Sequence, residues 1–476
     1  MSRECRPVSN DSGKPRTLVL CFDGTSDQYD ADNSNVVKFF ELLSKDPNHQ
    51  LCYYDPGIGT WFHPGVVSPL FDWFAKLMDQ AVAWYLDAHV MDGYKFLMQN
   101  YRHGDKICLF GFSRGAYTAR ALGGFLHKIG LLSRDNFSQV PFAYDLYKRR
   151  DKESVELAFG FKRTFCQSVR VEFMGVWDTV ASVGVIMGKT LPFTNSNSSI
   201  TTFRHALALD ERRAKYRPNV YHRPSPTLMA AALDPQGASA PLRSDTTSSS
   251  SSSSSGRKGK RSSVLRRVFS VKSEKEKDAE AAEQHRMMSI DEGGLPDDVL
   301  EVWFVGGHSG KCPAHHHRHS WNIHSTPIWW YLDVGGGNTL NTSTHSVANI
   351  PLRWMVREVM KSSCGIRFSE EALSRLSLDM TEVYDGIDAL EPIHDRLTGS
   401  FKNRLWWLLE IIPLTYSWQD KEGVWHRTWS FHLGRGRDIH DPKPKFHRSV
   451  EFRMKASNLG YKPKARWEEG TEEYVS

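Results

Sequence analysis

The sequence predicts an α/β protein whose mostly parallel central sheet is flanked by helices. Short apolar runs alternate with segments of helical spacing, which is typical of a mostly parallel sheet covered by helices on both faces. The chain has 476 residues, of which 40% are hydrophobic and 12% aromatic, so it can form a large core. The expected strands are 17–22, 50–54, 106–110, 169–177 and 300–305, and the expected helices are 36–43 and 71–101.

Charge and cysteine content suggest an environment and a class of partner. The net charge is +6, and many basic residues lie in 257–276 and 435–466, which fits an anionic partner such as a phospholipid surface. No zinc-finger, RNA-binding or leucine-zipper pattern occurs, so we expect no nucleic-acid partner. No signal peptide or apolar run long enough to span a membrane is visible, and the seven cysteines include no CxxC. We therefore expect a cytoplasmic protein in a reducing compartment, with nuclear targeting through 256–261 as an alternative.

The strongest motif is G-x-S-x-G between a predicted strand and a predicted helix. Ile107–Phe110 is followed by Gly111-Phe112-Ser113-Arg114-Gly115 and then by a helix-forming pattern. Such a turn is sharp, and Gly111 and Gly115 remove side chains that would collide with the strand and the helix. Ser113 would then be exposed at the carboxyl edge of the sheet, as a nucleophile must be. The alternative is a tight turn with an idle serine.

Two further residues complete a possible catalytic triad. Asp178 follows the predicted strand 169–177, and His308 follows the predicted strand 300–305. The carboxyl ends of parallel strands meet at one edge of a sheet, and Ser…Asp…His is a known chain order for such triads. Ser113, Asp178 and His308 are therefore the candidate catalytic residues. Separately, Asp178 could be a helix N-cap and His308 a structural histidine.

An oxyanion needs two backbone N–H donors. We expect one from Arg114, directly after the nucleophile, and the other from Gly24 or Thr25 in the loop after the first strand. Asp23 would position that loop, or would form a plain Asx turn. No metal and no cofactor is expected.

Several longer motifs resemble a known family. They are FDGT (22–25), GFSRGAYTAR (111–120), GVWDTVASVG (175–184), FRHALALDERR (203–213), VWFVGGHS (302–309) and DVGGG (333–337). Together they resemble the catalytic domain of the type VI secretion phospholipase effectors, which has many fungal members. The resemblance extends with gaps from about residue 16 to 466. It implies an α/β-hydrolase-like fold, a triad at Ser113, Asp178 and His308, and phospholipid acyl esters as substrates of the bacterial members.

Two segments depart from the expected domain at 16–466, which lies between tails 1–15 and 467–476. Residues 225–292 contain a pure serine run and then a charged run, and we expect a long disordered insertion there. Residues 310–332 hold five histidines whose spacing matches no metal-ligand pattern. They separate His308-Ser309 from Asp333 and Gly335, which the family keeps together beside the site.

The junctions of the 310–332 segment allow an in-frame intron. Gly310-Lys311-Cys312 can be encoded GGT AAG TGC, which contains the intron start GTAAGT. Leu332-Asp333 can be encoded with a terminal TAG, and removing the intervening bases restores GAC for aspartate. We therefore interpret 310–332 as a retained intron or a gene-model error from a fungal-type genome.

These observations predict a serine hydrolase that cleaves carboxylic esters, with acyl lipids as the expected substrates. The alternative is a catalytically inactive hydrolase-like scaffold or lipid-binding protein. The apolar stretch 404–413 (RLWWLLEIIP) is too short to span a membrane. It could lie in a membrane interface, although an ordinary core helix is the favoured interpretation.

Overall fold

The computed structural model describes most of the chain in several stretches. Contacts divide the chain into one unit of residues 1–222, 293–418 and 427–476 and a second of 223–292 and 419–426. Both expected interruptions, 225–292 and 310–332, lie outside the described residues. The described residues are 15–24, 33–57, 71–180, 191–221, 298–308, 345–375, 382–393, 395, 397, 407, 410–411, 414–421 and 425–476.

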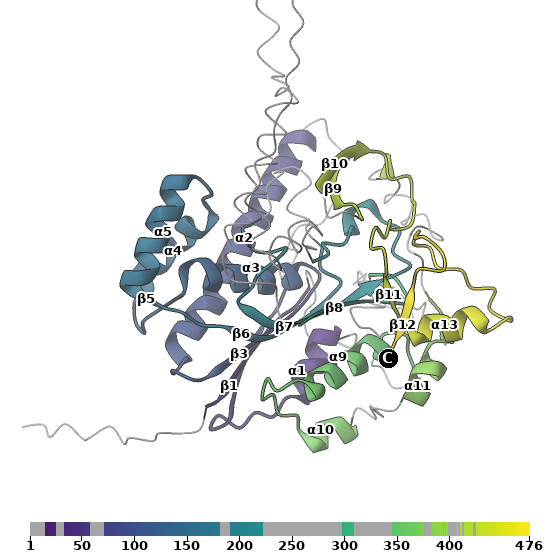
Figure 1. Ribbon diagram of the computed structural model, residues 1–476, viewed down its shortest axis with the longest axis horizontal. Helices are drawn as coiled ribbons and strands as arrows, with labels where there is room; N and C mark the ends of the chain where they lie inside the picture. The colour runs from purple at the N-terminus through teal and green to yellow at the C-terminus, as the bar shows by residue number, and fades with distance from the viewer. Residues whose placement is uncertain are drawn as a thin grey trace, which may run out of the picture. The chain divides into compact units, whose positions relative to one another are not determined.

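An eight-stranded parallel sheet organises the larger unit (Figure 1). Its spatial order is β12-β11-β8-β7-β6-β3-β1-β2, and every adjacent pair is parallel. This confirms the predicted fold class. The strands are β1 (Thr17–Phe22), β2 (Gln50–Asp55), β3 (Lys106–Phe112), β6 (Val171–Trp177), β7 (Ile200–Ala208), β8 (Asp298–Phe304), β11 (Lys445–His447) and β12 (Glu473–Val475).

Three strands of the sheet were not expected from the sequence: β7, β11 and β12, the last of which lies within the expected tail 467–476. The strand β7 was missed because Arg204 and His205 interrupt its apolar pattern. Both side chains are buried and paired. Arg204 donates to Glu358 at 2.6 Å, and His205 Nδ1 lies 2.7 Å from a Glu301 carboxylate oxygen. Partners from other segments therefore offset the cost of burying two polar groups at the centre of the sheet.

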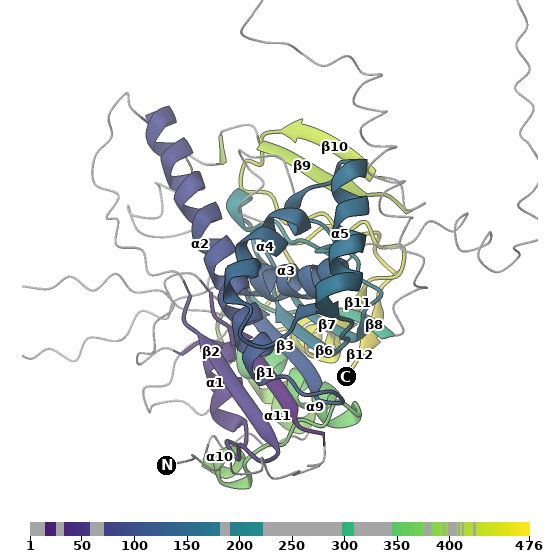
Figure 2. The same ribbon diagram turned by 90° about the vertical axis from the view of Figure 1, so that its left-hand side faces the viewer.

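Helices cover both faces of the sheet (Figures 1 and 2). Successive side chains of β1 point to opposite faces of the sheet. Leu18 and Leu20 belong to the core cluster on one face, and Val19 and Cys21 belong to the cluster on the other. The first cluster packs against α2 (Phe71–Asn100), α3 (Arg114–Ile129), α4 (Val140–Lys148) and α5 (Lys152–Phe165). The second packs against α1 (Asn35–Leu42), α9 (Asn349–Lys361) and α10 (Glu370–Arg375).

A smaller part of the core lies at the end of the sheet formed by β8, β11 and β12. A third core cluster joins Leu207 of β7 and Trp303 of β8 to Phe446 and Val450 near the C-terminus. Among the described helices, none is long and apolar enough to cross a membrane. The other elements are the strand pair β4 (Leu131–Leu132) and β5 (Cys166–Gln167), the strand pair β9 (Leu414–Gln419) and β10 (Trp425–Ser430), the 3-10 turns Phe137–Gln139 and Ala214–Tyr216, and the helices α11 (Glu382–Asp388) and α13 (Arg448–Lys455).

Candidate active site

Ser113 occupies a strained turn between β3 and α3. Its φ is 56° and its ψ is −119°, a conformation that L-residues rarely adopt and that is typical of functional turns. A Cβ on Gly111 would lie 2.4 Å from the carbonyl oxygen of Gly115, so the turn can close only with glycine there. The local sequence therefore builds a sharp elbow that holds one serine between strand and helix.

The elbow packs directly on the end of β1. A Cβ on Gly115 would lie 2.2 Å from the carbonyl oxygen of Phe22 and 2.4 Å from that of Asp23. On the other side of this loop, a Cβ on Gly57 would lie 1.5 Å from the carbonyl oxygen of Gly24. Three backbone segments therefore meet without side chains between them, and Gly115 fixes the loop after β1 next to Ser113.

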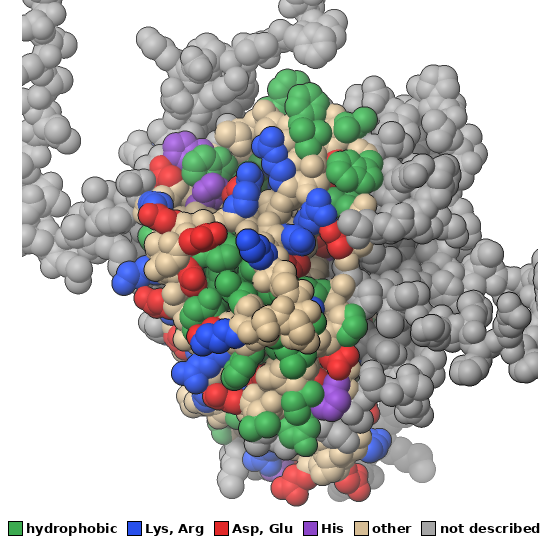
Figure 3. Space-filling model, turned by 90° about the vertical axis from the view of Figure 1, so that its right-hand side faces the viewer, with side chains coloured by type: hydrophobic (Ala, Val, Ile, Leu, Met, Phe, Trp, Pro, Cys, Tyr) green, Lys and Arg blue, Asp and Glu red, His purple; other side chains and the backbone are tan. Residues whose placement is uncertain are grey.

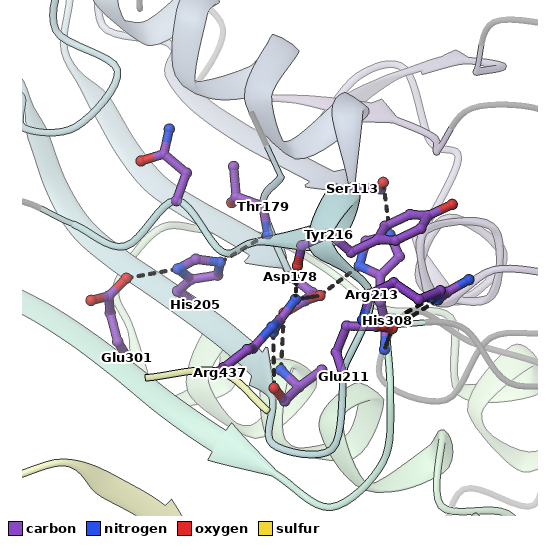
Figure 4. A network of polar contacts seen from close by, with 12 residues as sticks. Ser113, Asp178, Thr179, His205, Glu211, Arg213, Tyr216, Glu301, His308 and Arg437 are labelled. Atoms are coloured by element: carbon purple, nitrogen blue, oxygen red, sulfur yellow. Dashed lines mark hydrogen bonds and ion pairs between the residues drawn. The ribbon is translucent and has the colours of Figure 1, made fainter. Parts of the chain in front are cut away.

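Register brings the ends of β3, β6, β7 and β8 to one edge of the sheet. Phe112 pairs with Trp177, and Ala208 pairs with Phe304. The residues that follow these strands form a polar network (Figure 4). Its centre is a chain of two hydrogen bonds: Ser113 Oγ lies 2.9 Å from His308 Nε2, and His308 Nδ1 lies 2.5 Å from Asp178 Oδ2. The structure thus brings together the three residues that the sequence singled out, although Ser113 is buried rather than exposed as expected, at 6%.

Asp178 is fully buried and is held by Arg437. The guanidinium donates to both carboxylate oxygens, at 2.6 and 2.8 Å, and the Ala208 N–H donates to Oδ1 at 2.9 Å. Burial alone would raise the pKa of Asp178, but Arg437 and His308 outweigh it and hold the pKa well below its usual value. Asp178 is therefore ionised and able to orient a neighbouring imidazole.

His308 lies between two aromatic rings. The ring centroids of Phe112 and Tyr216 are 4.9 and 4.6 Å from that of the imidazole. The His308 backbone N–H donates to a Glu211 carboxylate oxygen at 3.0 Å. Burial lowers the pKa of His308 below 6.5 despite the neighbouring Asp178. The imidazole is therefore neutral at neutral pH, as a proton acceptor must be.

Glu211 and Arg213 form a buried pair beside the histidine. The Arg213 guanidinium donates to both Glu211 carboxylate oxygens, at 2.8 and 2.7 Å, and lies 4.0 Å from the centroid of the Tyr216 ring. Burial would raise the pKa of Glu211, but Arg213 lowers it to about 2. This pair fixes Tyr216 and the backbone of His308 from one side.

The expected loop after β1 is only partly described. Asp23 is buried and accepts hydrogen bonds from Ser34 and Tyr54, each at 2.7 Å. Burial outweighs these bonds and raises the pKa of Asp23 to about 6. The Gly24 N–H donates to the side chain of Asp23 at 2.7 Å, so in this conformation it points away from a substrate. Thr25, Asp333 and Gly335 lie outside the described residues.

Arg114 is the first residue of α3, where a helix leaves its N–H groups without intrahelical carbonyl partners. Its N–H is therefore on the same turn as Ser113. Within the described stretches, no group of three or more His, Cys, Asp or Glu side chains is arranged to hold a metal ion. The histidine cluster at 315–324 lies outside them.

A family model for the catalytic domain of the Tle1-like phospholipase effectors of the type VI secretion system matches residues 16–358. This chain belongs to that family. Membership confirms the resemblance seen in the sequence motifs and indicates a phospholipase-type hydrolase. The matched region contains Ser113, Asp178 and His308 but ends before Arg437, which contacts Asp178 from outside it.

The chain is also similar to individual proteins. An uncharacterized protein of Saccharomyces cerevisiae is 26% identical over 95% of this chain and 81% of its own length. An uncharacterized protein from Pseudomonas aeruginosa is 15% identical, with a TM-score of 0.36 over 80% of this chain, which spans about half (51%) of that protein. The Tle1 effector solved bound to the VgrG spike is 14% identical, with a TM-score of 0.33 over 91% of this chain and 96% of its own.

Four residues that support the site were not predicted from the sequence as site residues: Glu211, Arg213, Tyr216 and Arg437. Glu211 and Arg213 belong to the motif FRHALALDERR (203–213), which was noticed only as part of the resemblance. Arg437 lies in a basic C-terminal stretch, 259 positions from Asp178. No local pattern marks an ion pair over that separation.

Proposed function

We propose that this chain is a serine hydrolase that cleaves the carboxylic ester bonds of acyl lipids, with Ser113 as the nucleophile. The observation that carries the proposal is the hydrogen-bonded chain from Ser113 through His308 to Asp178. This order of hydroxyl, imidazole and carboxylate is what nucleophilic acyl transfer requires.

Each residue has a defined role in this mechanism. His308 Nε2 accepts the proton of Ser113 as Oγ attacks the ester carbonyl, and then delivers that proton to the leaving alkoxide. Asp178 accepts a hydrogen bond from His308 Nδ1, which keeps Nε2 free to act as the base and stabilises the imidazolium. Arg437 is a positioning residue, because it contacts Asp178 rather than the reacting atoms.

The negative charge that forms on the carbonyl oxygen needs N–H donors. The Arg114 N–H at the start of α3 is the first candidate, because it follows the nucleophile directly. The second donor would come from the loop after β1, which Gly115 holds against the elbow. Rotation of the Gly24 peptide away from Asp23, or the neighbouring Thr25, would supply it.

The test is the substitution Ser113→Ala, which removes only Oγ. Hydrolysis of a panel of acyl esters and phospholipids should fall by about 10³–10⁶, and labelling by a fluorophosphonate probe should disappear. Ser154→Ala is a matched control, since this buried serine lies on α5, away from the polar network. Ester turnover that persists in Ser113→Ala would overturn the proposal. A wild-type chain that neither turns over esters nor takes up the probe would overturn the proposal in favour of a catalytically inactive protein.

A further inference from the structure

A cavity of about 200 Å³ lies beside the polar network, and arginine side chains line it. Since one water needs only about 10–15 Å³ of accessible space, the cavity has room for a ligand of several non-hydrogen atoms. Its lining includes Arg213, Arg217, Arg437, Tyr416, Trp418 and His440. Figure 3 views the molecule from the side that carries β9, β10 and α13 in Figure 1, and shows Lys and Arg side chains grouped near hydrophobic ones.

Two of these arginines have unused donors. Arg217 Nη1 and Arg437 Nε are buried and have no hydrogen-bond partner within the described part of the chain. A buried polar group without a partner is costly, and a charged one more so. Arg437 is only 5% exposed, so its Nε cannot turn to bulk water. Two such donors on residues of one cavity indicate that the cavity receives a hydrogen-bond acceptor.

Nearby carboxylates do not satisfy these donors, because each has its own partner. Asp438 also lines the cavity, but it pairs with Arg466 at 2.7 Å. Glu410 acts on Arg217 electrostatically but is bonded to His432 at 2.6 Å. Arg213 is committed to Glu211, and the other two nitrogens of the Arg437 guanidinium to Asp178. The cavity therefore retains cationic N–H donors that no described carboxylate accepts from, which favours an anionic acceptor.

The walls also suit a tetrahedral oxyanion. Arg217 lies 4.6 Å from the centroid of the Tyr416 ring, and the rings of Trp418 and His440 stack at 4.2 Å. The contact with Tyr416 holds the guanidinium in place, and the stacked pair forms another part of the wall. On β10, the hydroxyl-bearing side chains of Thr428 and Ser430 also line the cavity and can donate to an anion's oxygens.

We infer that this cavity is a phosphate-binding site in which Arg217 and Arg437 supply the principal donors. The two guanidinium groups come from different segments, and phosphate can accept from both because its oxygens point in several directions. Because Arg437 also holds Asp178, the bound phosphate would be one side chain away from the candidate triad. The phosphate could belong to a lipid headgroup or be free in solution.

Exposed apolar side chains on β10 and just after it lie next to the cavity residues and are suited to contact with a lipid bilayer. Trp429, Phe431 and Leu433 are 74%, 53% and 46% exposed. They alternate with Thr428, Ser430 and His432, which line the cavity. An apolar outer row beside a phosphate cavity would allow a lipid headgroup to be bound while the row contacts the bilayer.

The experiment measures binding of inorganic phosphate to the full chain by isothermal titration calorimetry, at constant ionic strength with chloride as the reference anion. We expect saturable binding in the wild type and a loss of about tenfold or more in affinity in Arg217→Gln. Arg149→Gln removes the same charge from the C-cap of α4 and should bind like the wild type. Ser113→Ala should also bind like the wild type, so failure of the proposed hydrolysis would not affect this result.

A second arm separates the two sources. Ser113→Ala protein is sedimented with phosphatidylcholine vesicles, with and without phosphatidic acid. Binding that needs phosphatidic acid and is lost when Arg217→Gln is added identifies the lipid headgroup. Calorimetric phosphate binding without vesicle binding identifies free phosphate.

Two results would overturn the inference. One is that neither inorganic phosphate nor phosphatidic acid binds to protein with intact Arg217. The other is that Arg217→Gln binds as tightly as the wild type. If Arg217→Gln fails to fold, Thr428→Asp serves instead, because it adds a negative charge to the wall at an exposed position and should weaken binding by a similar factor.

Discussion

Replacing Arg437 with glutamine should destabilise the protein strongly, because Arg437 holds a buried carboxylate. The guanidinium makes four hydrogen bonds: two to Asp178, one to the carbonyl of Ala208 at 2.8 Å and one to that of Tyr216 at 2.5 Å. Removing one partner of a buried ion pair leaves the other charge uncompensated and costs about 3–5 kcal/mol. Arg437→Gln should therefore lower the free energy of unfolding by about that amount.

The measurement is equilibrium urea unfolding at pH 7.5, followed by tryptophan fluorescence. Arg466→Gln is the matched control, because Arg466 is 53% exposed and pairs with the exposed Asp438. Exposed pairs contribute about 0–1 kcal/mol, so this control should unfold close to the wild type. The contrast separates the loss of a buried pair from the loss of an arginine.

A second substitution tests whether Asp178 is the cause. Asp178→Asn removes the buried charge, so the double variant with Arg437→Gln should be less destabilised than the sum of the single variants, by about 1–3 kcal/mol. Additive losses would contradict the proposed cause. So would an Arg437→Gln variant as stable as the Arg466→Gln control.

The same pair gives a pH dependence with a definite sign. In the wild type the pKa of Asp178 is depressed on folding, so its contribution is present above the unfolded pKa of about 3.9 and is lost as the pH falls through the folded pKa. Without Arg437, burial dominates and raises the folded pKa, so stability is lost as the pH rises instead. The difference between wild type and Arg437→Gln should therefore be smaller at pH 4.5 than at pH 7.5.

Three further predictions concern the elbow, the base and the segment after His308. Gly115→Ala should lower the free energy of unfolding by several kcal/mol or prevent folding, because the new Cβ would lie 2.2 Å from a backbone oxygen. The control Gly160→Ala, with no described atom within 4 Å of its Cβ, should stabilise α5 by about 0.5–1 kcal/mol. Equal unfolding midpoints of the two variants would contradict this prediction. Because burial lowers the pKa of His308, the acidic limb of kcat/KM should lie below pH 6.5, and a limb above pH 7 would argue against His308 as the base. Deleting 310–332 should give a protein that is at least as stable as the full chain and more active, and cDNA should lack the segment. The intron hypothesis would be refuted if all mature transcripts retained the segment and the deletion variant were inactive.

Local sequence was enough to predict the elbow and five of the eight strands of the sheet. Gly111 and Gly115 flank Ser113 within five positions, and the need for small residues there comes from backbone contacts inside one turn. Asp178 and His308 could be predicted because parallel strands bring their carboxyl ends to one edge, and both residues follow apolar runs. The boundaries differ by only a few residues: the strand expected at 106–110 continues to Phe112.

The strand β7 shows where apolar patterns fail. Arg204 and His205 interrupt it, and they are tolerated at the centre of the sheet only because Glu358 and Glu301 pair with them. Those partners lie 154 and 96 positions away. A pattern read along one segment contains no information about a compensating charge in another.

The sequence by itself determined the parallel α/β architecture, the sharp turn at Ser113 and the edge at which the triad candidates lie, because buried strands and tight turns depend on neighbouring residues. Only the tertiary structure decided how that site is supported. Arg437 reaches Asp178 over 259 positions, and Arg217 and Arg437 line one cavity with unused donors. Such contacts depend on where distant segments pack, and the free energy of a buried charge is set by the partner that packing provides.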